Sequence, residues 1–402
     1  MRLFFLAILV ILLAGLILFG LGDTVISIAG TSIPAQTPNT NGIRLPSQHG
    51  AFYAEGRYWL FYYDTDEEIS FKSSTDGESW SSATKIGDAA LYGATFDVVF
   101  DGTYVHYIRN LDYLGGNDYL GIAYRRGIPQ SDGSINWSAA EQTVLEDTEV
   151  ANDMQLAVDS DGYAWIGYGG SDTPLYGYPT IIKSATSDGT WSTASGFPYT
   201  FFETDDWIVI PVSQTFGQVY CIVYRTHTST EVIKGYQWDG DSWGSEEEAT
   251  TSLLKNGSGN GYFGMLSAVA IEDDIHLAFT ATSGGLKHVK RTSGSWGSES
   301  TIEGTLLGWD TSPVLTRRTN GDLVCCWLYC NGSHTIEKSY YKEYSEGTWD
   351  ITATELTDEY DDKFVRLGSL QSYYEEMEWR FSLIYQVYDS GAYDIVHVII
   401  DF

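Results

Sequence analysis

The chain has 402 residues and a formal net charge of −32, because 54 Asp and Glu outnumber 22 Lys and Arg. Aromatic residues make up 15% of the chain, which is too much apolar surface for a disordered protein. So acidic a surface repels phosphate backbones, which excludes nucleic acid as a partner. The charge fits solubility, a saline or acidic habitat, cation binding or a basic partner, and composition does not choose among them.

The first predicted element is an apolar segment at the N-terminus. Residues 3–21 are all apolar or glycine, with Arg2 before them and Asp23 after them. This length predicts one hydrophobic helix, so that residues 1–22 are either a secretory signal peptide or a membrane anchor. Arg2 inside and the acidic remainder outside agree with the positive-inside rule. We therefore expect an exported protein, extracellular or displayed at the cell surface.

Residues 23–41 are predicted to form a tether with a possible closing strand. Residues 24–28 are β-prone and follow the apolar segment directly, and residues 42–45 are a second candidate for such a strand. Residues 30–41 have the composition of a loosely ordered loop, unless a closing strand holds them.

From residue 42 onward the sequence repeats one pattern, in which an apolar strand, a tight turn and a second apolar strand follow one another. Several turns are Asp-Gly or Asn-Gly, the strongest short-range signals for a β-hairpin. The predicted hairpins are residues 51–53 with 58–63, 98–100 with 104–108, 156–158 with 163–166, 210–212 with 219–224, 268–270 with 275–279, 314–315 with 323–327 and 370–372 with 379–385. A last strand is predicted at residues 393–400.

Tryptophans recur after six of these hairpins, each behind a cluster of turn-forming residues. They are Trp80, Trp137, Trp191, Trp243, Trp296 and Trp349, at steps of 57, 54, 52, 53 and 53 residues. A period just above fifty fits a four-stranded propeller blade. The sequence therefore predicts an all-β chain: a seven-bladed β-propeller of four-stranded antiparallel blades over residues 42–402, preceded by one N-terminal hydrophobic helix. The N-terminal strand would supply the outer strand that the seventh hairpin lacks.

The cysteines have no metal-binding or redox spacing. Cys221, Cys325, Cys326 and Cys330 form no Cys-x-x-Cys, and no two of them are expected to lie in a geometry that suits a disulfide. We expect them to be small buried apolar residues.

The order of hairpin, turn and tryptophan resembles the sialidase-like propellers with Asp-box (BNR) repeats, whose motif reads Ser-x-Asp-x-Gly-x-x-Trp. Residues 73–80 keep Ser, Gly and Trp in register and shift Asp by one position, whereas residues 130–137 keep Asp and Trp and displace Gly. In blade count the chain is closer to the seven-bladed polysaccharide lyases, to which residues 320–323 and 340–342 are similar. The resemblance implies that the boxes are structural and that their tryptophans pack between blades.

Residues 43–46, Ile-Arg-Leu-Pro, are similar to the Arg-Ile-Pro motif that precedes the first blade of sialidases. The resemblance implies that Arg44 belongs to an arginine triad that binds a substrate carboxylate, which Arg225 and Arg366 complete by position. Polysaccharide lyases neutralise a uronate carboxylate with Arg and use His or Tyr as base. Both resemblances point to carbohydrate as the ligand.

A propeller usually binds its ligand at the mouth of the central channel, on loops entering the innermost strands and loops after the second strands. Aromatic rings there stack on sugars, and Asp and Arg bind hydroxyl or carboxyl groups. The candidate ligand-binding residues on these loops are Arg44, His49, Asp97, Arg109, Asp153, Asp206, Trp207, Arg225, His227, Trp309, Asp310, His334 and Arg366. The alternative for each is structural: a turn carboxylate, a ring packed between blades or an ion pair.

The histidines divide into two groups. Those on predicted loops are candidate bases: His49, His227 and His334. Those inside predicted strands are expected to be packed: His106, His276 and His397. The neighbouring carboxylates Asp205 and Asp206 suit acid–base chemistry or Ca²⁺, the one cofactor the pattern suggests.

Three classes of function remain. The first is an exported, surface-displayed propeller that binds a glycan or a protein. The second is an extracellular carbohydrate-active enzyme, either a sialidase-like glycoside hydrolase or a polysaccharide lyase, with no residue singled out as catalytic. The third is a structural subunit of an envelope, filament or virion. The expected partners are a carbohydrate or a cell-surface protein, and the membrane through residues 3–21 if that segment is retained.

Overall fold

The computed structural model is all-β in the part of the chain that it describes. That part comprises residues 27–37, 49–64, 68–88, 96–115, 118–171, 177–204, 207–225, 232–254, 266–304, 313–318, 320–330, 336–356, 365–371, 380–389 and 392–401. Among these residues no helix is long and apolar enough to span a bilayer. The hydrophobic helix predicted within residues 1–22 lies outside them.

The first sheet joins the two ends of the described chain. Its eight strands, in spatial order, are β1 (Ser27–Thr37), β31 (Ala392–Asp401), β30 (Arg380–Asp389), β29 (Val365–Gln371), β2 (His49–Ala54), β3 (Arg57–Tyr63), β4 (Glu68–Ser74) and β5 (Thr84–Asp88). Strand β1 pairs antiparallel with β31, from Ser27 opposite Asp401 to Thr37 opposite Tyr393. Much of the segment expected as a tether is therefore an edge strand.

The second sheet contains one long strand, β11, that takes part in two neighbouring groups of strands. It comprises β6 (Phe96–Phe100), β7 (Val105–Arg109), β8 (Asp112–Gly115), β9 (Asp118–Pro129), β10 (Ile135–Trp137), β11 (Gln142–Val158), β12 (Ala164–Ser171), β13 (Tyr178–Lys183) and β14 (Tyr199–Thr200). The first half of β11 pairs with β9, and its second half pairs with β12. An outer strand of one group thus continues into the inner strand of the next.

The remaining three sheets repeat the same antiparallel meander. They consist of β15 (Trp207–Ser213), β16 (Val219–Arg225), β17 (Lys234–Trp238) and β18 (Glu247–Glu248); of β19 (Leu266–Ile271), β20 (Asp274–Thr280), β21 (Leu286–Thr292), β22 (Ser295–Trp296) and β23 (Ser300–Glu303); and of β24 (Val314–Arg317), β25 (Leu323–Cys330), β26 (Ile336–Ser345), β27 (Thr348–Trp349) and β28 (Thr354–Glu355).

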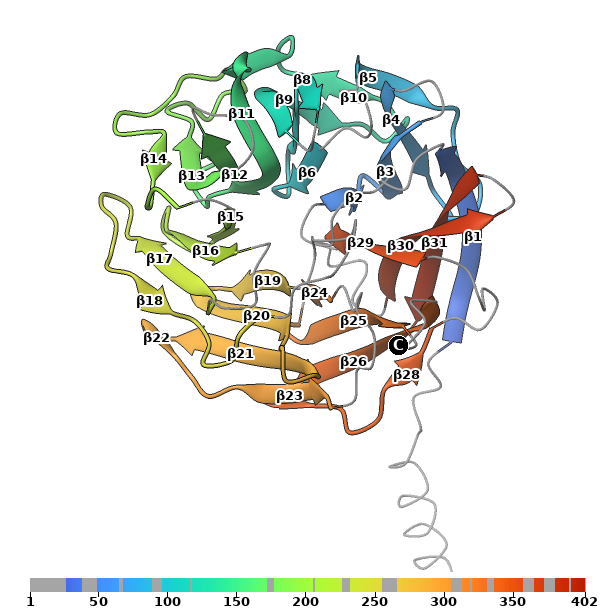
Figure 1. Cartoon of the computed structure of the whole chain (residues 1–402). Coiled ribbons are helices and arrows are strands. Elements are labelled where there is room, and N and C mark those ends of the chain that lie inside the picture. The colour runs from blue at the N-terminus through green and yellow to red at the C-terminus, as the bar shows by residue number, and fades with distance from the viewer. Residues whose placement is uncertain are drawn as a thin grey trace, which may run out of the picture.

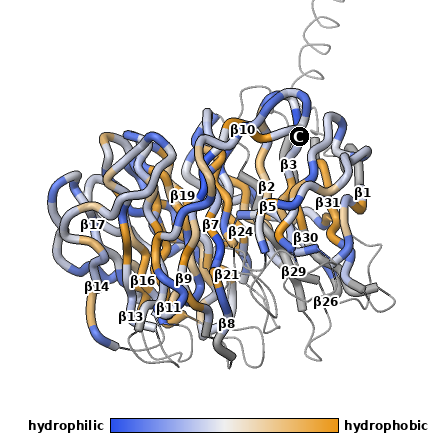
Figure 2. Tube along the Cα trace, turned by 90° about the horizontal axis from the view of Figure 1, so that it is seen from above, coloured by the Kyte–Doolittle hydropathy of each residue, from blue (hydrophilic) through white to orange (hydrophobic). Residues whose placement is uncertain are grey.

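The groups of strands stand side by side around a central axis, as in a β-propeller (Figure 1). The inner strands contact one another in the order β2, β6, β11, β15, β19, β24 and β29. Strand β29 pairs in parallel with β2, which closes the ring. Hydrophobic residues gather along the strands (Figure 2), and the buried clusters lie between successive groups.

The repeated tryptophans pack against the preceding group of strands, which confirms the role that the Asp-box resemblance implies. Five of them lie against a ring of that group, with centroid distances of 5.3 Å for Trp80 and His397, 5.3 Å for Trp191 and Tyr124, 6.2 Å for Trp243 and Trp165, 5.7 Å for Trp296 and Tyr220, and 5.3 Å for Trp349 and His288. Trp137 packs against the cluster that contains Phe61 and Phe71. These indoles join one group to the next.

Three of the four cysteines and the three histidines of the predicted strands are buried, as expected, and the side chain of Cys330 lies outside the described part. Cys221, Cys325 and Cys326 are free thiols with no exposed surface, and burial raises the pKa of each. The histidines expected to be packed are 1–2% exposed: His106, His276 and His397.

Candidate functional site

A cavity of about 430 Å³ lies among the inner strands. It is lined by the ends of β6, β11, β15 and β19 and by the turns that follow them, with His49 from the start of β2 and Arg317 from the end of β24. This volume falls in the range of small-molecule sites. The cavity thus extends toward the hairpin turns, whereas the sequence analysis placed a site on the loops that enter the inner strands.

Two carboxylates in the lining are held by the hairpin turns. Asp101 accepts hydrogen bonds from the backbone N–H of Thr103 and Tyr104 and from Nε2 of His106 at 3.0 Å. Burial alone raises the pKa of Asp101, but the hydrogen bonds from His106 and the turn outweigh it and lower the pKa. Asp101 is therefore an anion at neutral pH.

Asp159 occupies the equivalent turn in the next group. Its Oδ1 accepts from the backbone N–H of Tyr163 at 2.9 Å, and its Oδ2 accepts from Nε1 of Trp165 at 2.8 Å. The ammonium of Lys183 lies 3.7 Å from Oδ2. Together with the exposed Glu272, these carboxylates give the described lining three acidic groups against the one guanidinium of Arg317.

Among the predicted site residues that the structure describes, His49 alone lines the cavity. It was predicted on a loop, but it is the first residue of β2, because its backbone pairs with Ser369 of β29. Its Nδ1 lies 3.3 Å from Oδ1 of Asp97, which has no exposed surface. A carboxylate can only accept, so this contact favours the tautomer of His49 that carries its proton on Nδ1.

Side chains at one position of the inner strands hydrogen-bond the backbone of the next inner strand. Oδ2 of Asp97 on β6 accepts from the N–H of Leu156 on β11 at 2.6 Å. Oγ of Ser267 on β19 accepts from the N–H of Leu315 on β24 at 3.0 Å. In both pairs the acceptor satisfies a buried backbone donor of its neighbour, which stabilises the ring of strands.

Gln155 occupies this position on β11, but the corresponding residue of the next inner strand has no backbone N–H to donate. Asp97, Gln155 and Ile210 occupy the same place in successive inner strands, four residues before the residue whose N–H closes the hairpin turn. Where Asp97 meets the N–H of Leu156, Gln155 therefore meets Pro211, which has no N–H. Gln155 is 1% exposed, and neither its Nε2 nor its Oε1 has a hydrogen-bond partner among the described residues.

Both Gln155 and Pro211 line the cavity. A β-bulge directly before Gln155 shifts the register between Asn152 and Gln155, and Asp153 within it has a φ of 52°. Bulges of this kind re-aim side chains and are common beside functional sites. Leaving a buried amide without partners costs about 1–3 kcal/mol.

Other predicted site residues have structural partners. Arg109 forms a bidentate ion pair with Glu141, with contacts of 2.9 and 2.5 Å. Trp207 is 4% exposed and packs edge-on against Phe202 at 4.9 Å. Arg225 is the last residue of β16 and pairs across the hairpin with Trp207.

The remaining predicted residues are Arg366 and six residues that lie outside the described part of the chain. Arg366 lies in strand β29. Those six are Arg44, Asp206, His227, Trp309, Asp310 and His334. Sequence reasoning missed Gln155, although a glutamine about one repeat before a proline in adjacent inner strands was a usable signal.

No cluster of three or more His, Cys, Asp or Glu side chains with metal-binding geometry occurs among the described residues. The pair Asp205 and Asp206, named above for Ca²⁺, lies outside them.

Neither a protein-family model nor a curated protein matches the sequence. Among solved structures, the chain is similar to the BP39L lectin from Burkholderia pseudomallei, with a TM-score of 0.59 and 11% identity over 92% of this chain and 95% of the lectin. It is also similar to an ulvan lyase of polysaccharide lyase family PL25, with a TM-score of 0.57 and 11% identity over 90% of this chain and 94% of the lyase. At such low identity, what the chain shares with both proteins is the fold.

Proposed function

We propose that this chain is a seven-bladed β-propeller that binds a carbohydrate in its central cavity. The proposal rests on the cavity among the inner strands, whose lining includes Gln155 with a buried side-chain amide that has no hydrogen-bond partner among the described residues. Each of the seven contacting inner strands begins one blade in this proposal, and β1 supplies the outer strand of the blade formed by β29, β30 and β31.

The chemistry of the amide favours a ligand rich in hydroxyl groups. An amide offers two N–H donors and a carbonyl acceptor side by side, and each hydroxyl of a sugar can both donate and accept. The two similar solved structures support this class of ligand: one protein is a lectin, and the lyase structure is also known bound to -[GlcA(1-4)Rha3S]-. Because acidic side chains predominate in the described lining, a neutral sugar fits it better than a uronate.

Gln155→Met is expected to weaken ligand binding without harming the fold. The methionine has nearly the same volume and removes the unpartnered amide, so the free energy of unfolding should stay level or rise by about 1 kcal/mol. Losing two hydrogen bonds to the ligand should weaken affinity by about tenfold to a hundredfold. The wild-type chain would be screened on a glycan array, and the best neutral hit measured by calorimetry with both proteins.

Gln130→Met is the matched control, since Gln130 bonds only neighbouring carbonyls at the surface, such as that of Ile128 at 3.0 Å. Its affinity should equal that of the wild type. Equal affinity of Gln155→Met and wild type would contradict the proposed site, and absence of any bound glycan would contradict the proposed function.

A second candidate function, catalysis on a polysaccharide, is favoured by the contact between His49 and Asp97. A buried carboxylate behind an imidazole fixes its tautomer and directs Nε2 as a base. If the chain is an enzyme, His49→Gln should lower turnover about 100-fold or more while binding persists. Reducing ends and the absorbance of unsaturated uronates would be followed on neutral and acidic polysaccharides, and unchanged turnover in this variant would exclude His49 as the base.

We also propose that the chain is exported and displayed at the cell surface, with residues 1–22 serving as a signal peptide or anchor. The apolar run at residues 3–21 and the acidic remainder support this. Mass spectrometry of the purified protein would show whether the segment is cleaved, and fractionation of the source cells would show where the chain resides. A structural subunit remains the third class, supported by that same segment alone.

A further inference from the structure

An exposed phenylalanine occupies a strained position in the turn between β15 and β16. Phe216 is 83% exposed and has a φ of 55°, in the left-handed region that bulky side chains avoid. The other non-glycine residues with positive φ in the described chain are all polar: Glu55, Asp153, Glu272, Ser293 and Glu346. Neither burial nor backbone preference explains a phenylalanine here.

The turn that carries Phe216 is fixed to the turns on both sides of it. On one side, Nε2 of Gln214 donates to the carbonyl of Asp273 at 2.6 Å, and the N–H of Thr215 donates to its carboxylate at 3.2 Å. On the other side, the N–H of Gly217 donates to Oγ of Ser160 at 2.7 Å. Phe216 therefore lies on a turn that is hydrogen-bonded to the neighbouring turns on both sides.

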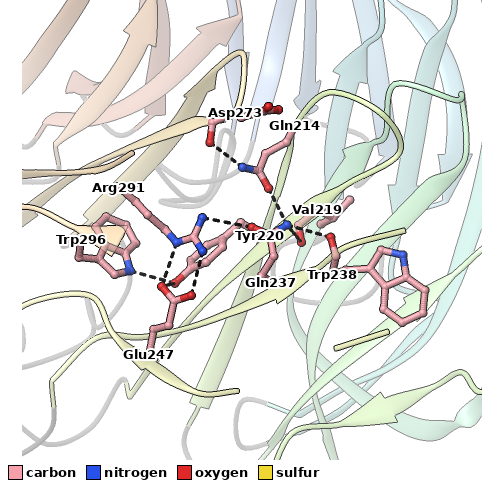
Figure 3. A network of polar contacts seen from close by, with 9 residues as sticks. All are labelled: Gln214, Val219, Tyr220, Gln237, Trp238, Glu247, Asp273, Arg291 and Trp296. Carbon is pink, nitrogen blue, oxygen red and sulfur yellow. Dashed lines mark hydrogen bonds and ion pairs between the residues drawn. The ribbon is translucent and has the colours of Figure 1, made fainter. Parts of the chain in front are cut away.

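A polar network behind this turn holds Gln214 in place (Figure 3). Oε1 of Gln214 accepts from Nε2 of Gln237 at 2.8 Å, and Oε1 of Gln237 accepts from Arg291 at 3.2 Å. Arg291 in turn forms a bidentate pair with Glu247, with contacts of 2.9 and 2.8 Å. The network spans two neighbouring groups of strands, so the turn is rigid relative to both.

The turn also borders the cavity, because Gln214 and Thr215 line it and Phe216 is the next residue. We propose that Phe216 is an aromatic platform at the rim, which stacks on the sugar ring adjoining the one bound beside Gln155. This rests on the proposed function and adds a second subsite, for the apolar C–H face of a pyranose. An amphipathic ligand of this kind needs a flat apolar surface beside polar groups, and the rim offers both.

A second copy of the chain fits this surface less well than a sugar does. The carboxylates of Asp161 and Asp273 lie beside the turn. A Cβ atom placed on Gly217 would be only 2.5 Å from Oδ2 of Asp161. Bringing two such rims together would oppose like charges in a protein of net charge −32. A neutral sugar avoids that repulsion.

The test compares full-length wild type with Phe216→Asn and Phe216→Trp, using an array of neutral oligosaccharides and their component monosaccharides as probes. Asparagine tolerates the left-handed conformation, so Phe216→Asn should raise the melting temperature by about 1 °C. It should nevertheless weaken oligosaccharide binding by about tenfold, while affinity for the monosaccharide stays the same. Phe216→Trp should retain oligosaccharide binding. Ile351→Asn, which removes another exposed apolar side chain (98% exposed), is the matched control and should bind as the wild type does.

The outcomes separate the two proposals. If Gln155→Met weakens binding but Phe216→Asn leaves oligosaccharide affinity intact, the platform is overturned and the central site stands. If Phe216→Asn weakens oligosaccharide and monosaccharide binding equally, or changes the oligomeric state without changing affinity, the platform is likewise overturned. If the wild type binds no member of the array, that result contradicts the proposed function and, with it, the proposed platform.

Discussion

Acidification from about pH 8 to about pH 5 is expected to lower the free energy of unfolding by about 6 kcal/mol. Burial lowers the pKa of His276 to about 4, that of His288 to about 3 and that of His397 to about 4, from an ordinary 6.5. In the unfolded chain these histidines take up protons near pH 6.5, whereas in the fold they stay neutral. Stability is therefore complete above pH 6.5 and falls as the pH drops toward about 4.

The size of the effect follows from these pKa values. A histidine with a folded pKa near 4 and an unfolded pKa near 6.5 loses about 2 kcal/mol at pH 5. His276, His288 and His397 each take up a proton on unfolding at pH 5, so the three losses add to about 6 kcal/mol. Most carboxylates remain ionised above pH 5, so relief of charge repulsion adds little in this range.

Urea unfolding at several pH values would measure this loss in wild type and in His397→Gln. The variant removes one titrating ring at the contact with Trp80, and its stability should fall about 2 kcal/mol less between pH 8 and pH 5. Equal pH dependence in both proteins would show that His397 binds its proton equally well in the folded and unfolded chains and would contradict the burial argument.

Trp165→Ala is expected to destabilise the fold by about 3–5 kcal/mol. Trp165 has no exposed surface and contacts Phe197, Trp238 and Trp243 edge-on, with centroids 5.4, 5.7 and 6.2 Å away. Truncation leaves a large cavity between two neighbouring groups of strands. It also removes the N–H donor from Asp159, so the lining of the central cavity should be disturbed as well.

Denaturant unfolding of Trp165→Ala and Trp165→Phe would measure these losses. The phenylalanine variant keeps much of the packing but lacks the indole N–H, so it should cost less than the alanine variant. Trp137→Ala is a control at a partly exposed tryptophan, which stacks under Arg125 at 4.4 Å, and it should have a smaller effect. A loss below about 1 kcal/mol in Trp165→Ala would contradict the packing role of this ring.

Strand pairs and tryptophan contacts were readable in the sequence because they depend on local signals. Alternating or continuous apolar runs around turns such as Asp161-Gly162 specify a hairpin within a few residues. The even spacing of the tryptophans placed each of them at an equivalent point of a repeat, so Trp296 and Trp349 face the preceding group as predicted.

The candidate site was harder to predict, because its features depend on which strands become neighbours. Six of the thirteen candidates from the sequence analysis lie outside the described part, and among the described candidates His49 alone lines the cavity. Asp97 and Arg109 had the right residue types, but the fold uses them to join strands through Leu156 and Glu141. A polar residue in a strand does not reveal whether its partner is backbone or ligand.

The sequence by itself determined the all-β class, the repeat length and the acidic surface, since these follow from composition and from patterns within a few residues or one repeat. Only the tertiary structure decided that Gln155 and Pro211 line one cavity and that the turn carrying Phe216 borders it through Gln214 and Thr215. Each side chain reaches its partner through the register of neighbouring strands. A shift of one residue would turn those side chains to the opposite face of the sheet, and local propensity does not set that register.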